Sequence, residues 1–505
     1  MSLYKSTGGT GRFQDFAFIH VSHPDDIKER HTQRAVRRGA MAQTAASRRK
    51  RPPKPPTVPL HVPSQLPSLL PSSTGSINSP VPLHTTSTPV TPVTPNKDDV
   101  EAMSRWLETS MLWRTLPDTT AYPIIQPDTR ARELFYFMHG ESASIYRPSS
   151  FRLEWFAMAM LDQSAYYLSL ANAALILNLR RKNLTASCGF EYSEYPESSK
   201  YYHICLSQVT RRLGDVMEGV SKGMVTTVLG FICHDSSIGN WTRWKLHMDG
   251  LERIIKLRGG LQGLGMAVPL FVFWFDVTGS AVFDTPPRFP IPSQLPQTDI
   301  TRREGLSQPV RDLLSRLRAA GLNDVSEALI KVMAVANYVN QHACPEFWSD
   351  GLGATKLIGP AAHYILSLPR LFNDRTTQPG QVIREMVRLV SLVLLARLKK
   401  AFFLITDELN CLTERFRTLS GRMEGVALFP EVRIWAHLIV AVSAEEGGII
   451  ILSEAGKKEV RRALGQLDIR TGLEGVEVAK GITWIDAFVT SDMEGRIAAE
   501  IDHST

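Results

Sequence analysis

The side chains best suited to bind a metal or to act as nucleophiles are few and scattered in this sequence. Its five cysteines are Cys188, Cys205, Cys233, Cys344 and Cys411. None of them forms a C-x-x-C pair, whereas a closed zinc site needs several thiolates or imidazoles at short, regular spacings. An odd, dispersed set therefore favours reduced thiols in an intracellular protein over a disulfide framework or a zinc site.

Histidines and carboxylates do not form a catalytic pattern either. The HVSH motif near the N-terminus has no third metal ligand close by, so we interpret its histidines as loop residues. The pairs His234–Asp235 and His247–Asp249 are isolated in the sequence, which favours core or surface roles for them over catalysis. An Asp-rich magnesium motif on a buried helix is not found, because DDVEA lies at a helix start and NDVSE lacks the carboxylate spacing.

Motifs of nucleotide-binding and hydrolytic enzymes are also missing from the sequence. GGLQGLG (Gly259–Gly265) is glycine-rich, but it follows a predicted helix rather than a strand and lacks the Lys-Ser/Thr of a P-loop. Neither G-x-S-x-G nor H-E-x-x-H occurs. We therefore predict no catalytic, cofactor or metal site and a protein that is not an enzyme. An unrecognised all-α enzyme is the least favoured alternative.

Nearly all of the net charge lies in the first 56 residues, which we call the basic arm. The basic arm holds twelve Lys and Arg against four Asp and Glu, a balance of +8, while the rest of the chain has a balance of −1. The net charge of +7 is therefore set by this one segment. Because the remainder is almost neutral, composition does not predict a broad basic surface for nucleic acid.

The basic residues of the arm form two groups with a nine-residue spacer, followed by prolines. They are Arg37, Arg38, Arg48, Arg49, Lys50, Arg51 and Lys54. The acidic groove of an import receptor needs several cations on an extended chain, and the prolines keep the chain extended. We predict a nuclear-import signal, an import receptor as partner and localisation in the nucleus. Weak, sequence-independent and salt-dependent DNA contact is one alternative. A solvated charge run is the other.

A change of composition separates this arm from the rest of the chain. Residues Val58–Pro95 are rich in Pro, Ser and Thr and contain no Lys, Arg, Asp or Glu. Such a segment cannot bury enough apolar area to offset the entropy of ordering it, so we predict a disordered linker over 57–97. Its four Ser/Thr-Pro pairs are candidate kinase sites, although plain linker composition is the favoured explanation.

Helical periodicity dominates the chain from Asp98 onward. Trp155–Leu179 is long and apolar nearly all round, which predicts a central buried helix. Met386–Ile405 is interrupted by four Arg and Lys residues, so it is a buried helix rather than a membrane span. The proline-rich segment 283–308 predicts a long surface loop or a linker between helical groups. We expect an all-α irregular multi-helix bundle over 98–490 and a C-terminal tail over 491–505. No secretory signal peptide is recognised at the start.

The most informative stretch of the body is WTRWKLHMDGLERIIKLRGGLQGLG (Trp241–Gly265). Its apolar residues fall at three- and four-residue steps, which predicts an amphipathic helix, and two glycines follow that can end it. The residues that define its motif are Trp244, His247, Gly250, Leu251, Arg258, Gly259 and Gly260. On periodicity alone, their role is structural.

This motif resembles the middle homology region of fungal zinc-cluster transcription factors. That region belongs to the fungal-specific transcription factor domain family. Two further stretches agree: Phe16–Pro52 is similar to the opening of a subgroup of such proteins, and Phe429–Ala444 is similar to the family's C-terminal P-x-x-x-x-W helix. The resemblance implies an all-α regulatory domain. It also implies action through transcriptional co-regulators, a DNA-binding partner, homodimerisation or a small effector.

One departure from the family limits what the resemblance implies. The family's DNA-binding module holds two zinc ions with six cysteines, and this sequence has no cysteine before Cys188. We therefore predict a nuclear transcription-regulator-like protein without its own zinc-cluster module and without a membrane partner. The alternative is a helical scaffold or ligand-sensing protein that is derived from the family and does not bind DNA.

Overall fold

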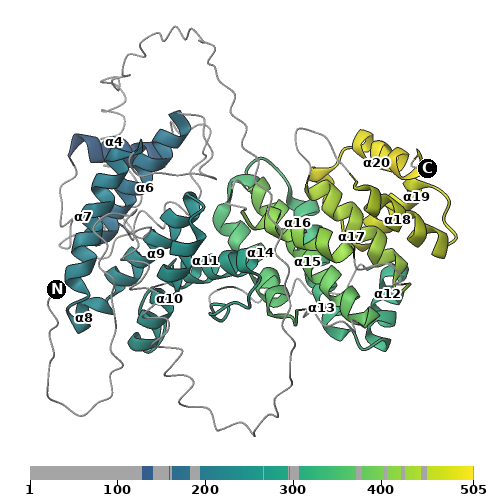
Figure 1. The fold of residues 1–505 in the computed structure, drawn as a ribbon, viewed down its shortest axis with the longest axis horizontal. Coiled ribbons are helices and arrows are strands. Elements are labelled where there is room, and N and C mark those ends of the chain that lie inside the picture. The colour runs from purple at the N-terminus through teal and green to yellow at the C-terminus, as the bar shows by residue number, and fades with distance from the viewer. Residues whose placement is uncertain are drawn as a thin grey trace, which may run out of the picture. The chain divides into compact units, whose positions relative to one another are not determined.

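Helices make up the regular secondary structure of the part of the chain that the structure describes. The computed structural model describes residues 128–139, 159, 162–181, 194–265, 267–293, 295, 306–370, 378–402, 404, 407–421, 427–444 and 452–503. No strand occurs within these ranges (Figure 1). The predicted all-α class is confirmed for them. The predicted basic arm (1–56), the predicted linker (57–97) and the helix expected from Asp98 lie outside the described residues.

The described helices fall into two groups, which are joined by α11 (Ala267–Phe283). The first group is α4 (Thr129–His139), α6 (Gln163–Arg181), α7 (Pro196–Arg212), α8 (Val216–Gly219), α9 (Lys222–Ser237) and α10 (Trp241–Arg258). The second group is α12 (Gln308–Ala319), α13 (Asn323–His342), η3 (Phe347–Ser349), α14 (Gly351–Ser367), α15 (Pro379–Ala401), α16 (Asp407–Ser420), α17 (Pro430–Ser443), α18 (Glu454–Gln466), α19 (Gly472–Ile482), η4 (Asp486–Phe488) and α20 (Ser491–His503).

Several helices begin where a short polar side chain can satisfy the first free N–H groups. Ser221 accepts a hydrogen bond from Met224 N at the start of α9, and Asn240 accepts one from Arg243 N at the start of α10. Such caps typically contribute about 1 kcal/mol of stability. Proline at the first helical position, as in α7, α15 and α17, fixes a helical φ at a position whose N–H has no intrahelical partner. Local sequence thus sets these boundaries.

Two hydrophobic cores lie on the two sides of α11. Phe271 and Val272 belong to the core formed with the first group, while Phe273 and Val277 belong to the core formed with the second group. All but three of the 17 residues of α11 are buried. In the first group α6 packs against α7 and α9 (Figure 1). The helix that joins the two cores is therefore α11, whereas the sequence predicted a central role only for the α6 region.

The predicted buried helix at Met386–Ile405 is observed as α15. Arg388 is fully buried in it and pairs with Glu385 and Asp284, and Lys399 is nearly buried and pairs with Glu408. Buried charges need such partners because leaving them unpaired in an apolar interior is costly. Across the described helices, none combines the length and the apolar content that crossing a bilayer requires.

Two sequence predictions about irregular segments need correction. The predicted C-terminal tail 491–505 contains α20, whose Ile497 and Ile501 are buried in the second core, because an apolar face recurs at helical spacing there. The proline-rich segment has no helix over 284–293, but it is not wholly on the surface. Phe289 is buried; its N–H donates to Asp276 Oδ2 at 2.9 Å, and its carbonyl accepts from His363 Nε2 at 2.9 Å.

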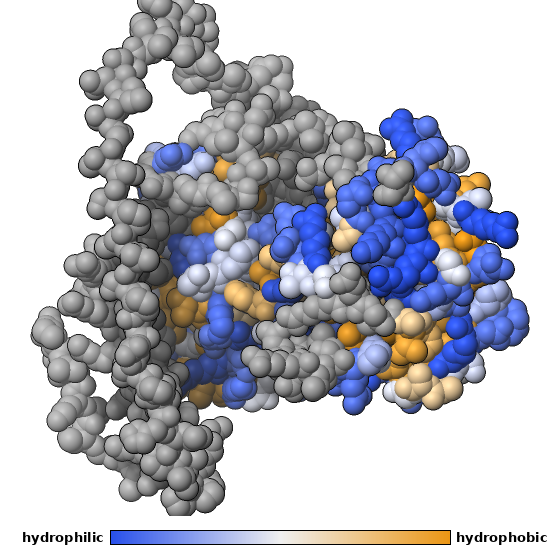
Figure 2. Space-filling view, turned by 45° about the vertical axis from the view of Figure 1, so that its right-hand side comes forward, coloured by the Kyte–Doolittle hydropathy of each residue, from blue (hydrophilic) through white to orange (hydrophobic). Residues whose placement is uncertain are grey.

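The described surface is mainly polar on the face seen in Figure 2. Hydrophilic residues predominate there, with smaller apolar areas between them. This distribution is ordinary for a folded body whose apolar side chains are used in its cores.

Candidate functional site

The predicted import residues cannot be placed in the fold. Arg37, Arg38, Arg48, Arg49, Lys50, Arg51 and Lys54 all lie outside the described residues. Their role therefore stays a prediction from the sequence.

The motif helix is α10, and its predicted apolar face is buried. Trp244, Met248, Leu251 and Ile255 all contribute to the first core. The predicted glycine end is confirmed. Gly259 caps the helix in the left-handed region at φ 85°, where glycine carries no steric penalty. The next residue also has a positive φ, of 119°, and its N–H donates to Ile255 O at 2.9 Å.

Motif residue Trp244 fixes α10 against α11. Its ring lies directly over Gly279, where an added Cβ would be only 1.9 Å from the indole. The neighbouring Trp241 donates from Nε1 to Asp407 Oδ2 at 3.0 Å, which ties α10 to the start of α16. In contrast, motif residue Gly250 is exposed, and an added Cβ there would meet no atom within 4 Å among the described residues.

Motif residue His247 takes part in a buried charge network that its sequence neighbours did not predict. Its Nδ1 lies 2.7 Å from Asp235 Oδ2, and Arg243 Nη2 lies 2.5 Å from Asp235 Oδ1. Burial alone would raise the pKa of Asp235, but the charge of Arg243 and the contact with His247 outweigh it and lower that pKa. The two histidine–aspartate pairs that looked isolated are thus linked across α9 and α10, a long-range contact that no local spacing reveals.

The second histidine of this region is held in a neutral form. His234 is fully buried in α9, and its Nδ1 lies 2.5 Å from Asn172 Oδ1 of α6. Burial, with the nearby charge of Arg243, lowers the pKa of His234 to about 3. A neutral imidazole beside an amide oxygen orients α9 against α6 without a buried charge.

The network around Asp235 holds α9 against α10. The ring of His247 stacks on Phe231, with centroids 4.9 Å apart, and its Nδ1 is occupied by Asp235. A histidine–aspartate pair can activate a side-chain hydroxyl or thiol on the other ring nitrogen, and no such contact is seen among the described residues. Nor does the described part of the chain bring three His, Cys, Asp or Glu side chains together as metal ligands.

The last motif side chain leads from α10 to a neighbouring pocket. Arg258 Nη1 donates to Val220 O at 2.8 Å, in the turn between α8 and α9. The following residue, Ser221, caps α9 and lies at the pocket edge. The motif therefore connects directly to the backbone of this polar pocket, which the sequence did not predict.

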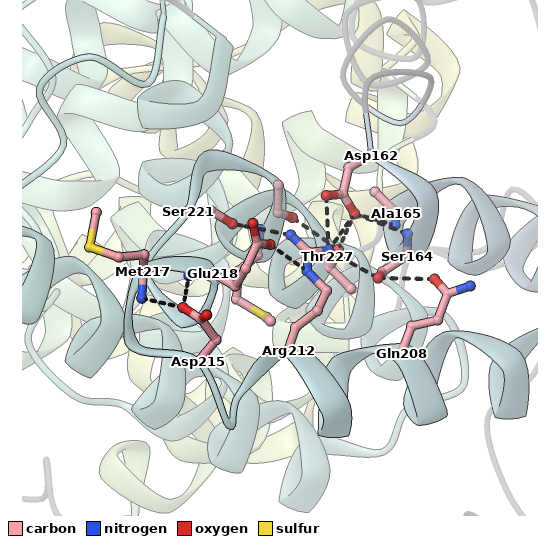
Figure 3. Close-up of polar contacts among 12 residues, drawn as sticks. Asp162, Ser164, Ala165, Gln208, Arg212, Asp215, Met217, Glu218, Ser221 and Thr227 are labelled. Atoms are coloured by element: carbon pink, nitrogen blue, oxygen red, sulfur yellow. Dashed lines mark hydrogen bonds and ion pairs between the residues drawn. The ribbon is translucent and has the colours of Figure 1, made fainter. Parts of the chain in front are cut away.

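An arginine at the end of α7 organises the pocket (Figure 3). Arg212 Nη1 donates to Asp162 Oδ1 and to Ser164 Oγ, both at 3.0 Å, and Nη2 donates to Ser221 Oγ at 3.1 Å. Its Nε donates to Glu218 Oε2 at 3.1 Å. Burial alone would lower the pKa of Arg212, but the hydrogen bond and charge of Asp162 raise it. One guanidinium thus joins the ends of four helices.

Asp162 is the main partner of this arginine and also the first-turn cap of α6. Its Oδ1 accepts from Ser164 N at 3.0 Å and from Ala165 N at 3.1 Å, and it lies 3.1 Å from Thr227 Oγ1 (Figure 3). Gly223 of α9 passes so close that an added Cβ would be 1.8 Å from Asp162 Oδ2. Only glycine permits this approach of α9 to the carboxylate.

The pocket itself has a volume of about 610 Å³ and lies where α6, α7, α8 and α9 meet. This volume is within the range of small-molecule sites. Its lining contains no aliphatic or aromatic side chain: it consists of hydroxyls, amides, a glycine, two carboxylates and three cations. Arg211 and Lys222 are the cations beside Arg212, and neither has an ion-pair partner among the described residues. The arrangement suits a polar, anionic ligand.

The sequence contained only indirect signals of this site. Asp162 before a helical run and Ser221 before MVTTVLGF are helix-start signals, and RRLGD marks a helix end. Nothing in local spacing shows that these three ends converge. The site residues come from positions up to 65 residues apart, such as Asp162 and Thr227.

Comparison with known proteins supports the resemblance found in the sequence. Residues 139–320 match the model of a family described as the fungal specific transcription factor domain. The match covers about a third of the chain and includes the motif helix, the charge network and the polar pocket. No curated protein and no solved structure matches the chain.

Proposed function

From the similarity of residues 139–320 to the fungal specific transcription factor domain, we propose that this protein regulates transcription in the nucleus and is not an enzyme. The observation that carries the proposal is the match itself, together with a motif helix that is built into the core of the matched segment. The helical body acts through transcriptional co-regulators or a DNA-binding partner, or by homodimerisation. The proposal uses no zinc-cluster module, because the residues in hand include no paired cysteines that could hold one.

The basic arm has a separate task in this proposal. Its two groups of cations bind an import receptor, and they add weak, sequence-independent contact with DNA. The concentration of charge in residues 1–56 supports this division, since the rest of the chain is nearly neutral. Electrostatic attraction is thereby confined to one segment, and the body is left to make shape-dependent contacts.

Import is tested with residues 1–56 fused to a tandem fluorescent protein that is too large to diffuse through nuclear pores. We expect nuclear accumulation of the native fusion. Changing Arg48, Arg49, Lys50 and Arg51 to Gln should return the signal to the cytoplasm, while changing Lys5 and Arg12 to Gln is the control and should not. A cytoplasmic native fusion would remove the import role.

A second candidate function is a ligand-sensing or scaffold protein that is derived from the same family and does not bind DNA. The polar pocket favours the ligand sensor, because it has room for a small molecule and three cations line it. The two candidates differ in chromatin association, which a regulator requires and a scaffold does not.

A further inference from the structure

The polar pocket between α6 and α9 contains more positive charges than the ion pairs among the described residues account for. Three cations and two carboxylates line it, and Arg212 alone contacts both Asp162 and Glu218. Both negative charges are therefore taken by one guanidinium. Arg211 and Lys222 keep their positive charges with no acidic partner among the described residues.

Two glutamine amides line the same pocket as these two cations. Gln208 Oε1 accepts from Ser164 Oγ at 3.1 Å, and this contact leaves its amide NH₂ group available. Gln163 lines the same pocket, and its side chain has no hydrogen-bond partner among the described residues. Ammonium, guanidinium and amide groups together match the oxygens of a phosphate or a carboxylate, and charge-assisted hydrogen bonds of this kind are the strong ones.

The lining also limits the chemistry of the ligand body. A typical drug-like pocket is mainly apolar, but this one has no aliphatic or aromatic side chain. A ligand that fills it must pair its own polar groups with serine hydroxyls and amides, because buried polar groups without partners are costly. Hydroxylated, water-soluble molecules meet this condition, and acids with long apolar chains do not.

We propose that this pocket binds a small hydroxylated anion, with its phosphate or carboxylate group against Arg211 and Lys222. Binding there is coupled to the motif helix, because Ser221 at the pocket edge follows Val220, whose carbonyl accepts from Arg258. The proposal goes beyond the function above and does not depend on it. Failure of import or of chromatin association leaves the binding test unchanged.

The test measures binding of three probes to the full chain: inorganic phosphate, glucose 6-phosphate and citrate. Each is titrated at constant ionic strength, with sodium chloride as the reference, while thermal stability and binding heat are followed. We expect saturable stabilisation by at least one probe and not by chloride. Preference for the phosphates or for citrate decides which anion group the pocket accepts.

A charge-matched pair of variants assigns the effect to the pocket. Arg211→Gln with Lys222→Gln should weaken the apparent affinity about a hundred-fold, since each of the two lost contacts to a charged group is worth about ten-fold. Arg470→Gln with Lys356→Gln removes the same charges from exposed positions away from the pocket and should leave the affinity unchanged. The cations of the basic arm bind anions in both proteins, so the difference between the variants isolates the pocket.

Two results would overturn the proposal. One is the absence of saturable stabilisation by all three probes. The other is an equal loss of affinity in the pocket variant and in the control variant, which would assign the effect to overall charge. Circular dichroism confirms folding, and the single changes Arg211→Gln and Lys222→Gln replace the double variant if it does not fold.

Discussion

An arginine with acidic partners organises each half of the fold, yet the surroundings of the two differ. Arg212 pairs with Asp162 in the first half, and Arg388 pairs with Asp284 in the second. The side chain of Arg212 is 15% exposed and faces a pocket of about 610 Å³. The side chain of Arg388 is fully buried, and a cavity in the same half, beside Lys399, measures only about 20 Å³.

These two pairs show that a well-partnered arginine does not by itself mark a binding site. Both arginines are well partnered, and the desolvation cost of such pairs nearly cancels their attraction. What distinguishes the first half is open space together with Arg211 and Lys222, which have no acidic partners among the described residues. The ion pairs around Arg388 stabilise the packing of the second half, whereas the pocket of the first half has the space and the charge to bind a ligand.

The largest predicted effect is on the ion-pair network of Arg388 with Asp284 and Glu385. Changing Arg388 to Ala removes its charge from the buried Glu385 and leaves the partly buried Asp284 paired only with Arg370 among the described residues, so the free energy of unfolding should fall by about 3–5 kcal/mol. Arg384 on the same helix forms a quarter-exposed pair with Asp324, and its change to Ala should cost only about 1 kcal/mol or less. Urea unfolding measures both. Equal losses would show that the Arg388 network is not specially buried.

A second prediction concerns the loop that adjoins this network. Burial raises the pKa of Asp276 from 3.8 to about 6, although its Oδ2 accepts from the N–H groups of Phe289 and Arg288. The folded state thus binds this proton more tightly than the unfolded chain does. Between pH 4 and 6, ionisation of Asp276 should lower the free energy of unfolding by about 3 kcal/mol as the pH rises.

Replacing Asp276 with Asn removes this titration and keeps an acceptor oxygen for the two N–H groups. Relative to the native chain, the variant should gain about 3 kcal/mol between pH 4 and pH 7, because only the native chain has the Asp276 titration and every other group titrates in both proteins. Urea unfolding of both proteins at the two pH values measures the difference. A constant difference would mean that Asp276 does not titrate in this range.

A third prediction sets two glycines of the first half against each other. Ala at Gly223 would push its Cβ into Asp162 and displace the cap of α6, which should cost about 1–3 kcal/mol. Ala at the exposed helical Gly250 meets open space, so it should stabilise the protein by up to about 1 kcal/mol. Thermal unfolding distinguishes the two. Destabilisation by Gly250→Ala would reveal a packing role that the described residues do not show.

The smallest predicted effect on stability belongs to the pocket cations. Because Arg211 and Lys222 are exposed and support no ion pair among the described residues, changing both to Gln should alter the free energy of unfolding by less than about 0.5 kcal/mol. This near-neutral result, measured by urea unfolding without added anion, separates a binding role from a structural one. A loss of several kcal/mol would place the two cations in the support of the fold.

Local patterns predicted the parts of the fold that depend on local physics. The apolar face of α10 and its glycine end follow from helical periodicity and from the left-handed conformation of Gly259, and both are observed. The α15 region was predicted to be buried because it is mostly apolar, and its four charges argued against a membrane span. In each case the signal lies within one turn or one helix.

Contacts between distant segments could not be predicted in this way. Asp235 and His247 lie on different helices, and the pocket joins Asp162 to residues of α7 and α9. Their side chains meet only after the helices pack, and no residue type or spacing marks the meeting. The sequence also missed α11, although its apolar run between Gly265 and the proline-rich segment was a usable signal.

The central claim, that this protein regulates transcription, is tested most directly by a chromatin-occupancy profile of the full chain. We predict reproducible enrichment at discrete promoter sites, reached through a DNA-binding partner, and loss of that enrichment when Arg48, Arg49, Lys50 and Arg51 are changed to Gln and import fails. A profile without enriched sites, from a chain shown to be present in the nucleus, would contradict the claim and favour the scaffold or ligand sensor.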